Sequence, residues 1–318
     1  MRVEQLSDTW TASSRAMASV ITITMAQRAS GEVDLDSSAQ RAFDVFRDVE
    51  VAATRFDPSS PLMRANSSPR RWHRVPPVLF RALEEAHSAY QRTSGLFDPR
   101  VVKDLVSLGY DASLNFAAGE VRVGAPAEVL SERAPWWPLF RAHKNDVWLG
   151  EPVELGGIGK GLAVRWASEI LSSQLSDFLV EAGGDCYLAG RAPDGGPWRV
   201  GVEDPLGGTT PVAVLSLSDR AVATSSIRLR HWRAGEHAVH HLIDPRTRRS
   251  GGEGLSAVTV VGSDPANAEV DTKVLFLAGR ENIAQVALGH GLAALWCDVQ
   301  GRVSYSPAMA PYLEWQRS

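Results

Sequence analysis

The spacing of apolar residues along the chain predicts several amphipathic helices. Over residues 38–55, apolar side chains recur at three- and four-residue steps, and Ser37 or Ser38 is expected to cap this helix. A second helix is predicted over residues 75–93, because prolines stand in its first turn and Gly95 follows its end. Further helices are predicted over residues 161–175, 265–278 and 283–289.

Alternating β-branched residues predict strands between these helices. The run SVITITM, residues 19–25, is the clearest case. Shorter apolar runs predict strands over residues 146–149, 178–181, 198–202, 212–217 and 293–298. The segment 56–72 contains three prolines and is expected to be a polar loop. Because helices dominate early and strands dominate later, the pattern favours an α+β fold over an alternating, doubly wound one.

Composition and charge narrow the class of protein. The chain has 318 residues with 33 basic and 37 acidic side chains, a formal net charge of −4, so bulk charge does not favour nucleic-acid binding. Cys186 and Cys297 are its only cysteines, which fits a reducing compartment. No apolar run reaches membrane-spanning length, and residues 1–11 lack the pattern of a signal peptide. We therefore expect a cytoplasmic protein with no integral membrane segment and no nucleic-acid partner.

The chain offers no obvious domain boundary. It contains no repeat, no low-complexity tract and no linker rich in proline, glycine and serine. A length of 318 residues is compatible with one large domain or with about two ordinary ones. We expect a single domain over residues 1–318, in which two lobes can form without a clear linker.

A glycine-rich segment, LGGIGKGLAVRWASEIL at residues 155–171, is the most informative part of the chain for function. Its four early glycines allow a ligand to approach the backbone closely, and the N–H groups at the start of the following helix favour an anion. Lys160 lies inside this turn as a point charge suited to phosphate or carboxylate. The segment matches neither the Walker A order nor a complete GxGxxG fingerprint. The alternative is a tight strand-to-helix turn with an exposed lysine.

Two further segments carry polar groups next to predicted strands. Gly183 and Gly184 follow a buried strand, which indicates close approach of a ligand or of another backbone segment. Asp185 can accept hydrogen bonds or face a metal, although an aspartate that caps a local turn is the commoner case. Thr224 and Ser225 offer hydroxyl groups near a strand end, but such pairs are also usual in turns.

Adjacent histidines form the third polar segment, HHLIDPRT at residues 240–247. Neighbouring residues on a strand point to opposite faces, so only one of the two can be a site residue, and we favour His241. A histidine in this setting can act as a general base or bind phosphate. The alternative is a histidine at the surface or at the edge of the core.

Oxygen-bearing side chains that could bind a hard cation are scattered along the chain, and their spacing alone establishes no metal site. Asp98 and Asp244 each precede a proline and can simply start a turn. The candidates are Asn66, Asp98, Glu203, Asp204, Asp244, Glu269 and Asp271.

Taken together and in order, these segments resemble the ApbE family, the FAD:protein FMN transferases. The resemblance extends over about residues 16–278, and the order of eight motifs makes it specific where a single motif would not. The motifs are FDPSSPLMRAN, TSGLFDPRVV, LGGIGKGLAV, LVEAGGDCYLAG, WRVGVEDP, VATSS, HHLIDPRT and AEVDTKVLFLAG.

The resemblance implies a fold and a reaction. The fold would be that of an ApbE-like flavin transferase domain, related to the T-fold, with mixed helices and antiparallel sheets and a flavin cleft between two lobes. FAD would be the substrate: a Ser or Thr hydroxyl of an acceptor flavoprotein attacks the phosphate of the FMN half, and AMP leaves. A divalent cation, usually magnesium, normally helps to neutralise the charge in this family.

The resemblance also implies roles for particular residues. His241 would be the base or a phosphate contact, while Lys160 and Lys273, with Arg165, would stabilise phosphate charge. Glu269 would orient Lys273 or bind a residual cation. The residues implied to contact the flavin nucleotide are Met17, Asn66, Asp98, Lys160, Glu181, Gly183, Gly184, Asp185, Thr224, Ser225 and His241.

The last motif departs from the family pattern, ADxxxT, in which the aspartate and the threonine help to hold magnesium. The equivalent residues here are Glu269 and Lys273. An ammonium group has no lone pair for a cation and repels it, so Lys273 can pair with Glu269 four residues earlier and replace the metal's charge. A local realignment onto Asp271 and Thr272 would instead preserve a metal site.

Smaller departures are Ser226 in place of a glycine, Arg165 in place of a frequent acidic residue, and Ala18 in place of a glycine. Together the changes remove metal-binding oxygens and add cationic side chains, which makes magnesium doubtful as a cofactor. Two alternatives to the transferase therefore stay open: a non-catalytic FAD-binding protein for storage, sensing or electron transfer, and an FAD pyrophosphatase that uses water as the nucleophile.

Overall fold

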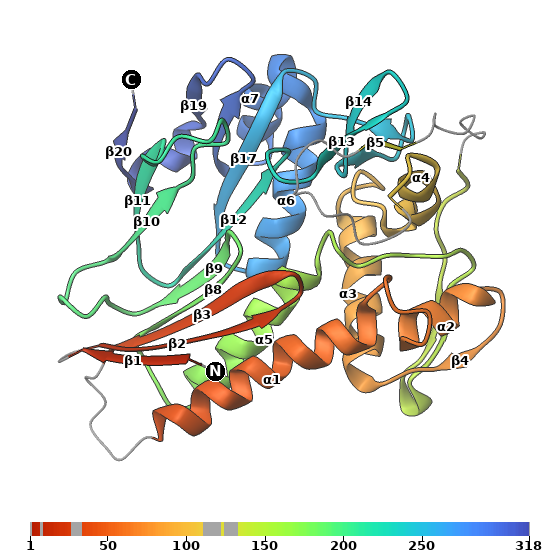
Figure 1. Cartoon of the computed structure of the whole chain (residues 1–318), viewed down its shortest axis with the longest axis horizontal. Coiled ribbons are helices and arrows are strands. Elements are labelled where there is room, and N and C mark those ends of the chain that lie inside the picture. The colour runs from red at the N-terminus through yellow and green to blue at the C-terminus, as the bar shows by residue number, and fades with distance from the viewer. Residues whose placement is uncertain (1, 7–8, 27–33, 111–121, 124–132, 318) are drawn as a thin grey trace.

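The computed structural model of the chain describes residues 2–6, 9–26, 34–110, 122–123 and 133–317. Within these residues, nine strands form one sheet in which all neighbours pair antiparallel (Figure 1). In spatial order they are β1 (Arg2–Leu6), β2 (Thr9–Ala16), β3 (Ser19–Ala26), β8 (Phe178–Ala182), β9 (Asp185–Ala189), β12 (Arg220–Ser226), β17 (Leu255–Gly262), β18 (Ala293–Asp298) and β19 (Val303–Tyr305).

Smaller sheets and several helices surround this main sheet. One small sheet consists of β10 (Trp198–Val202), β11 (Ala213–Leu217) and β20 (Leu313–Gln316). A second consists of β14 (His237–His240), β13 (His231–Ala234) and β5 (Arg122–Val123), and a third of β4 (His73–Arg74), β7 (Asp146–Trp148) and β6 (Leu139–Arg141). Strands β15 (Ile243–Asp244) and β16 (Arg249–Ser250) form a two-stranded sheet. The helices are α1 (Leu35–Ala53), α2 (Pro61–Ser67), α3 (Pro77–Arg92), η1 (Pro99–Val101), α4 (Val102–Ser107), η3 (Ala142–Lys144), α5 (Gly159–Ser172), α6 (Pro265–Leu277), α7 (Gly279–Gly289) and η4 (Pro307–Tyr312).

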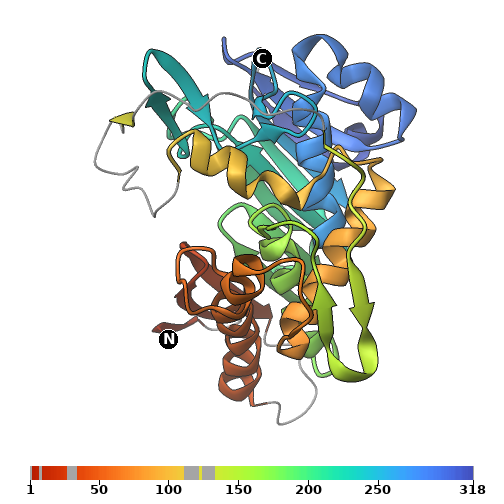
Figure 2. The same ribbon diagram turned by 90° about the vertical axis from the view of Figure 1, so that its right-hand side faces the viewer.

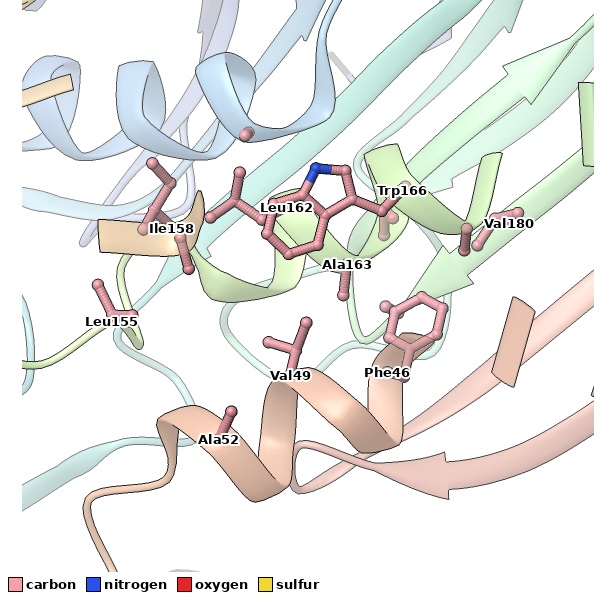
Figure 3. Close-up of a cluster of buried hydrophobic side chains, with 14 of the residues drawn as sticks. Phe46, Val49, Ala52, Leu155, Ile158, Leu162, Ala163, Trp166 and Val180 are labelled. Carbon is pink, nitrogen blue, oxygen red and sulfur yellow. The ribbon is translucent and has the colours of Figure 1, made fainter. Parts of the chain in front are cut away.

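Two helices cover one face of the main sheet. Helix α5 packs on β8 and β9, and α6 packs on β12 and β17. Helix α1 lies outside α5, so that Phe46 and Val49 belong to one buried cluster with Leu162, Ala163 and Trp166 (Figure 3). All five side chains are buried, as the helical spacing of apolar residues in both helices requires.

The opposite face of the sheet packs against the small sheet of β10, β11 and β20. Cys186 and Leu188 of β9 belong to one buried cluster with Trp198, Leu215 and Leu217. This part of the main sheet is therefore covered on both faces, which explains why β18 is buried along its whole length.

A separate apolar cluster joins α4 to the β13–β14 hairpin, which lie side by side in Figures 1 and 2. Trp232 is at its centre and donates its indole N–H to the Leu108 carbonyl oxygen at 2.6 Å. The buried carboxylate of Asp104 in α4 adds an electrostatic tie, because it accepts from both Arg133 and Arg248. This cluster supports the hairpin that leads to His241.

The α+β class is confirmed, and several predicted elements match closely. The strands at 198–202 and 293–298 have the predicted bounds, while α5 begins at Gly159, two residues before the predicted start. Helix α7 begins at Gly279, earlier than predicted. No helix in the described ranges combines the length and the apolar character that crossing a membrane requires.

Two predictions about local structure were wrong. The cap of α1 is Asp34, whose carboxylate accepts from the backbone N–H of Ser37, so neither Ser37 nor Ser38 caps the helix. The predicted polar loop 56–72 contains α2. Ser60 caps this short helix through the N–H of Met63, and Pro61 occupies its first position, where a missing N–H costs nothing.

Gly161 allows α5 and α6 to approach each other at backbone distance. A Cβ atom at this position would lie 2.6 Å from the Pro265 carbonyl oxygen and 2.7 Å from Ala266 Cα, which are both backbone atoms of α6. No side-chain rotation can relieve such a contact, so any larger residue must push the two helices apart.

We predict that Gly161→Ala lowers the free energy of unfolding by about 1–3 kcal/mol, because the added methyl group overpacks this contact. Gly289→Ala is the matched control, since nothing lies within 4 Å of a Cβ atom at Gly289. Its expected effect is a gain of up to about 1 kcal/mol. Urea denaturation measures both, and equal stability of the two variants would contradict the close approach.

Candidate functional site

The site is built where the first turn of α5 meets α6. Oε2 of Glu269 accepts a hydrogen bond from the backbone N–H of Gly161 at 2.8 Å. The carboxylate is buried, and this hydrogen bond satisfies one of the free N–H donors at the start of α5. The positive end of the helix dipole points toward the same place.

Lys273 lies one turn further along α6 and pairs with the same carboxylate. Its Nζ atom is 3.4 Å from Glu269 Oε1 and donates to the Glu269 carbonyl oxygen at 3.1 Å. Only 17% of the lysine side chain and 3% of the glutamate side chain are exposed. The stem of Lys273 passes the glycine-rich turn closely, because a Cβ atom at Gly157 would lie 3.2 Å from Lys273 Cε.

Lys160 forms a second ion pair, with Asp185 at the start of β9. Asp185 is almost fully buried and also accepts from the backbone N–H of Thr224 at 3.3 Å. Burial by itself would lower the pKa of Lys160, but the charges of Asp185 and Glu269 outweigh burial and raise this pKa. Lys160 is therefore an ammonium at neutral pH. We call Lys160, Asp185, Glu269 and Lys273 the lysine–carboxylate cluster.

Hydroxyl groups tie the adjacent strands to α6. The Ser225 hydroxyl is 2.7 Å from that of Thr272, and Thr272 donates to the Glu269 carbonyl oxygen at 2.7 Å. Thr224 pairs with Thr259 on the neighbouring strand, with 2.9 Å between their hydroxyl oxygens. Ser225 thus acts on the cluster through α6, while Thr224 reaches Asp185 through its backbone.

His241 lies one residue beyond the end of β14, and its ring has a defined hydrogen-bonding state. Nδ1 is 3.3 Å from the Arg230 carbonyl oxygen. A carbonyl can only accept, so Nδ1 carries the proton and Nε2 keeps its lone pair. Burial and the Arg230 charge hold the pKa of His241 well below its usual value of 6.5. A neutral imidazole with a free lone pair can accept a proton.

His240 has a different environment from His241. Its Nδ1 accepts from the Leu242 N–H at 3.3 Å, and its ring packs edge-on against Phe276. Burial lowers the pKa of His240 to about 4. His240 is therefore a structural residue.

Two charged residues near the cluster were missed in the sequence analysis. Burial raises the pKa of Glu154, against the opposing charges of Arg55, Lys273 and Arg230. Arg230 also acts on the pKa values of Lys160 and His241, so its charge lies close to both parts of the site. Glu154 directly precedes the glycine-rich segment, and Arg230 follows VATSS by a few residues. Charge next to a motif was the available signal in both cases.

Asn66 and Asp98 are buried and fully used in local structure. Asn66 clamps the backbone of Val153 from both sides, with its amide donating to the carbonyl at 2.8 Å and its oxygen accepting from the N–H at 2.9 Å. Asp98 caps η1 and pairs with Arg100 at 2.7 Å. The structure therefore assigns both residues a role in positioning the chain before and beside the glycine-rich turn and does not bring either into the cluster.

The glycine pair forms the β8–β9 turn with positive φ angles of 60° at Gly183 and 93° at Gly184. A Cβ atom at Gly183 would lie 2.5 Å from the Ser19 hydroxyl oxygen, so the close approach at this glycine is to β3. Glu181 stabilises the turn by accepting from the Gly184 N–H at 3.2 Å.

Met17 lies in the β2–β3 turn and reaches the start of α5. Its N–H donates to Glu50 at 2.8 Å, and a Cβ atom at Gly159 would be 3.4 Å from the Met17 methyl carbon. Met17 and Ala18 both have left-handed backbone angles, with φ of 52° and 57°. Glycine would adopt this conformation with less strain than Ala18 does.

Arg165 is not part of the lysine–carboxylate cluster, which corrects the expectation that its charge faces phosphate. It pairs with Glu85 at 2.9 Å and with Asp264 at 2.5 Å. Two carboxylates neutralise its charge, so Arg165 ties α5 to α3 and to the cap of α6.

The residues do not fit a divalent cation. Within the described ranges, no group of three or more His, Cys, Asp or Glu side chains is placed to hold a metal. Each acidic candidate from the sequence has a cationic partner instead, and so has Asp185. The pairs are Asp98–Arg100, Asp185–Lys160, Glu203–Arg228, Asp204–Arg317, Asp244–Arg246, Glu269–Lys273 and Asp271–Arg92.

The fold and the cluster define an α+β protein with a charged site at the start of a helix, and comparison with known sequences identifies the family. The family model "ApbE family" matches residues 17–296, so the chain belongs to the ApbE family. The chain is 29% identical over 247 residues to a Rhodobacter capsulatus protein named FAD:protein FMN transferase, which covers 76% of this chain and 46% of the relative. An Escherichia coli K12 protein of the same name is 27% identical over 161 residues, 50% of this chain and 46% of the relative. The matched parts therefore span just under half of each relative's length.

Solved structures confirm the predicted ApbE-like fold. The ApbE protein of Thermotoga maritima superposes with a TM-score of 0.81 at 22% identity, over 98% of this chain and all of that one. The flavin transferase ApbE of Vibrio cholerae superposes with a TM-score of 0.75 at 21% identity, over 98% of this chain and all of that one. The single domain over residues 1–318 with two lobes stays a prediction.

We predict that Lys160→Met lowers the free energy of unfolding by about 3–5 kcal/mol, because it leaves the buried Asp185 carboxylate without its cation. The double variant Lys160→Met/Asp185→Asn removes both charges and is expected to recover most of this loss. Lys144→Met, at an exposed lysine, is the control, with an expected change within about 0.5 kcal/mol. If urea denaturation gave Lys160→Met and Lys144→Met the same free energy of unfolding, the ion pair would not stabilise the fold.

Proposed function

We propose that this chain is an FAD:protein FMN transferase, which moves FMN from FAD to a Ser or Thr hydroxyl of an acceptor flavoprotein. Family membership and the names of the relatives support this function. The structural observation that carries it is the lysine–carboxylate cluster at the start of α5, near a neutral His241. Two ammonium groups and a helix N-terminus suit the negative charge of a dinucleotide pyrophosphate.

The proposed reaction is a single phosphoryl substitution. The acceptor hydroxyl oxygen bonds to the phosphorus of the FMN half, and the bond from that phosphorus to the bridging oxygen breaks. The bridging oxygen keeps the electron pair and leaves as part of AMP. The hydroxyl proton passes to Nε2 of His241 and from there to water, so the imidazole returns to its neutral form.

The other residues of the site bind and orient the substrate in this proposal. Lys160 and Lys273 hold the pyrophosphate oxygens, and Arg230 adds positive charge nearby. Glu269 orients Lys273 through their ion pair. Gly184 leaves room for the flavin nucleotide beside Thr224, while Asn66 and Asp98 support the surrounding backbone. No step uses magnesium, because the residues do not fit it.

The acceptor is proposed to be a flavoprotein with an exposed Ser or Thr segment that can reach the cluster. Its identity depends on surfaces of that partner.

The cytoplasmic location stays a prediction. Both cysteines of the chain are free and buried, which is compatible with a reducing compartment.

A transfer assay tests the function directly. The purified chain is incubated with FAD and an acceptor domain that the Vibrio cholerae flavin transferase labels in a parallel reaction. In-gel flavin fluorescence and intact mass then follow the acceptor. A mass gain of one FMN with release of AMP is the expected result. Free FMN without an acceptor would indicate a pyrophosphatase, and tight FAD binding without products would indicate a binding protein.

We predict that His241→Gln lowers the transfer rate about 10²–10⁴-fold with little change in FAD affinity, because glutamine can donate to Arg230 but cannot accept the proton. The wild-type rate should fall only as the pH drops below 6.5, because burial lowers the pKa of His241 and the protonated ring is no longer a base. His237→Gln, at an exposed histidine of the same hairpin, is the control. An acid limb above pH 6.5, or one that persists in His241→Gln, would assign the base to another group.

A further inference from the structure

The buried carboxylates of the cluster are already neutralised by side chains of the chain itself. Glu269 uses Oε1 for Lys273 and Oε2 for the N–H of Gly161. Asp185 uses its oxygens for Lys160 and for the N–H of Thr224. A divalent cation bound to either carboxylate would lie next to the ammonium group already paired with it, and like charges in a partly buried site repel strongly.

The position of Lys273 is set by its surroundings. Its stem passes Gly157, whose missing side chain provides the space, and its ammonium group is fixed by two oxygens of Glu269. An ammonium has three N–H donors, so one donor remains for a ligand after these two contacts. Such a group is preorganised, because little side-chain freedom is left to be lost when a ligand binds.

We propose that the ammonium group of Lys273 takes the place of a divalent cation, so that this chain binds FAD and transfers FMN without magnesium. The inference rests on the proposed function. Lys273 and Lys160 together supply two positive charges, the same total as one divalent ion, and both are delivered by fixed side chains. The free N–H of Lys273 donates to a pyrophosphate oxygen, and this charge-assisted bond persists as negative charge develops on the leaving AMP oxygen.

Electrostatics also explains why a carboxylate, that of Glu269, lies beside Lys273. Burial penalises an isolated ammonium, and the neighbouring carboxylate removes that penalty. The same carboxylate caps Gly161, so the position of Lys273 is coupled to the first turn of α5. In this proposal Lys273 supplies the cation and Glu269 supplies its counter-charge, and both lie at the end of α5 that faces the phosphates.

FAD binding tests the inference without an acceptor. The full chain is dialysed against EDTA, its metal content is checked by mass spectrometry, and FAD affinity is measured by calorimetry in EDTA and in excess magnesium. We expect the same dissociation constant in both buffers. A wild-type affinity that falls at least about 10-fold in EDTA would overturn the inference.

Two variants locate the effect at Lys273. Lys273→Thr is expected to weaken FAD binding about 10- to 100-fold in EDTA, the usual range for one lost bond to a charged group. The double variant Glu269→Gln/Lys273→Met leaves no buried unpaired charge, can still accept from Gly161 and should show the same loss with a near-normal melting temperature. Lys144→Thr is the matched control and should bind FAD like the wild type. FAD binding by Lys273→Thr at wild-type affinity in EDTA would also overturn the inference.

The same measurements separate the inference from the function on which it rests. A folded wild-type chain that binds no FAD in either buffer contradicts the proposed function. FAD binding and FMN transfer that occur only with magnesium leave the function standing and refute the role of Lys273. Transfer to the acceptor in EDTA at the rate seen with magnesium supports both.

Discussion

The backbone approach of α5 to α6 at Gly161 is the constraint on which the site depends. Because no side chain stands between the helices, the carboxylate of Glu269 reaches the N–H of Gly161 and caps the first turn of α5. That contact sets where Lys273 lies, and it brings the lysine to the same helix end as Lys160. Packing between two helices thus decides the electrostatics of the site.

The site is unusual in how it distributes charge. Buried carboxylates in proteins that bind phosphate esters often hold a metal, which then carries the positive charge. Here Asp185 and Glu269 each hold a lysine, so the positive charge is covalently part of the chain. This arrangement exchanges the adjustable coordination of an ion for two groups whose positions are fixed by helices and by a strand. Burial lowers the pKa of His241, and the charges of Arg230 and Lys273 lower it further, so the ring is neutral.

The resemblance to the ApbE family was visible because its motifs are continuous in sequence and fall in a fixed order. Most motifs contain a turn or the end of a strand or helix, where glycine, aspartate and proline have strong local preferences. Residues such as Glu154 and Arg230 carry no local signal beyond a charge next to a motif, because their effect depends on charges from segments distant in the chain. Likewise, Asn66 and Asp98 look like ligands in sequence, but their partners, Val153 and Arg100, take up their polar atoms.

The sequence by itself determined the α+β class, the longer helices, some of the strands and the family, because periodicity and turn residues are local properties. It also predicts a changed metal motif at Lys273, since a helical four-residue spacing is local too. It did not determine the cap at Asp34 or helix α2, since competing polar residues in short segments have similar preferences. Only the tertiary structure decided that Arg165 is neutralised by Glu85 and Asp264 while Lys160 and Lys273 meet at one helix end. The reason is that ion pairing depends on distance in space, and packing of α5 against α6 sets that distance.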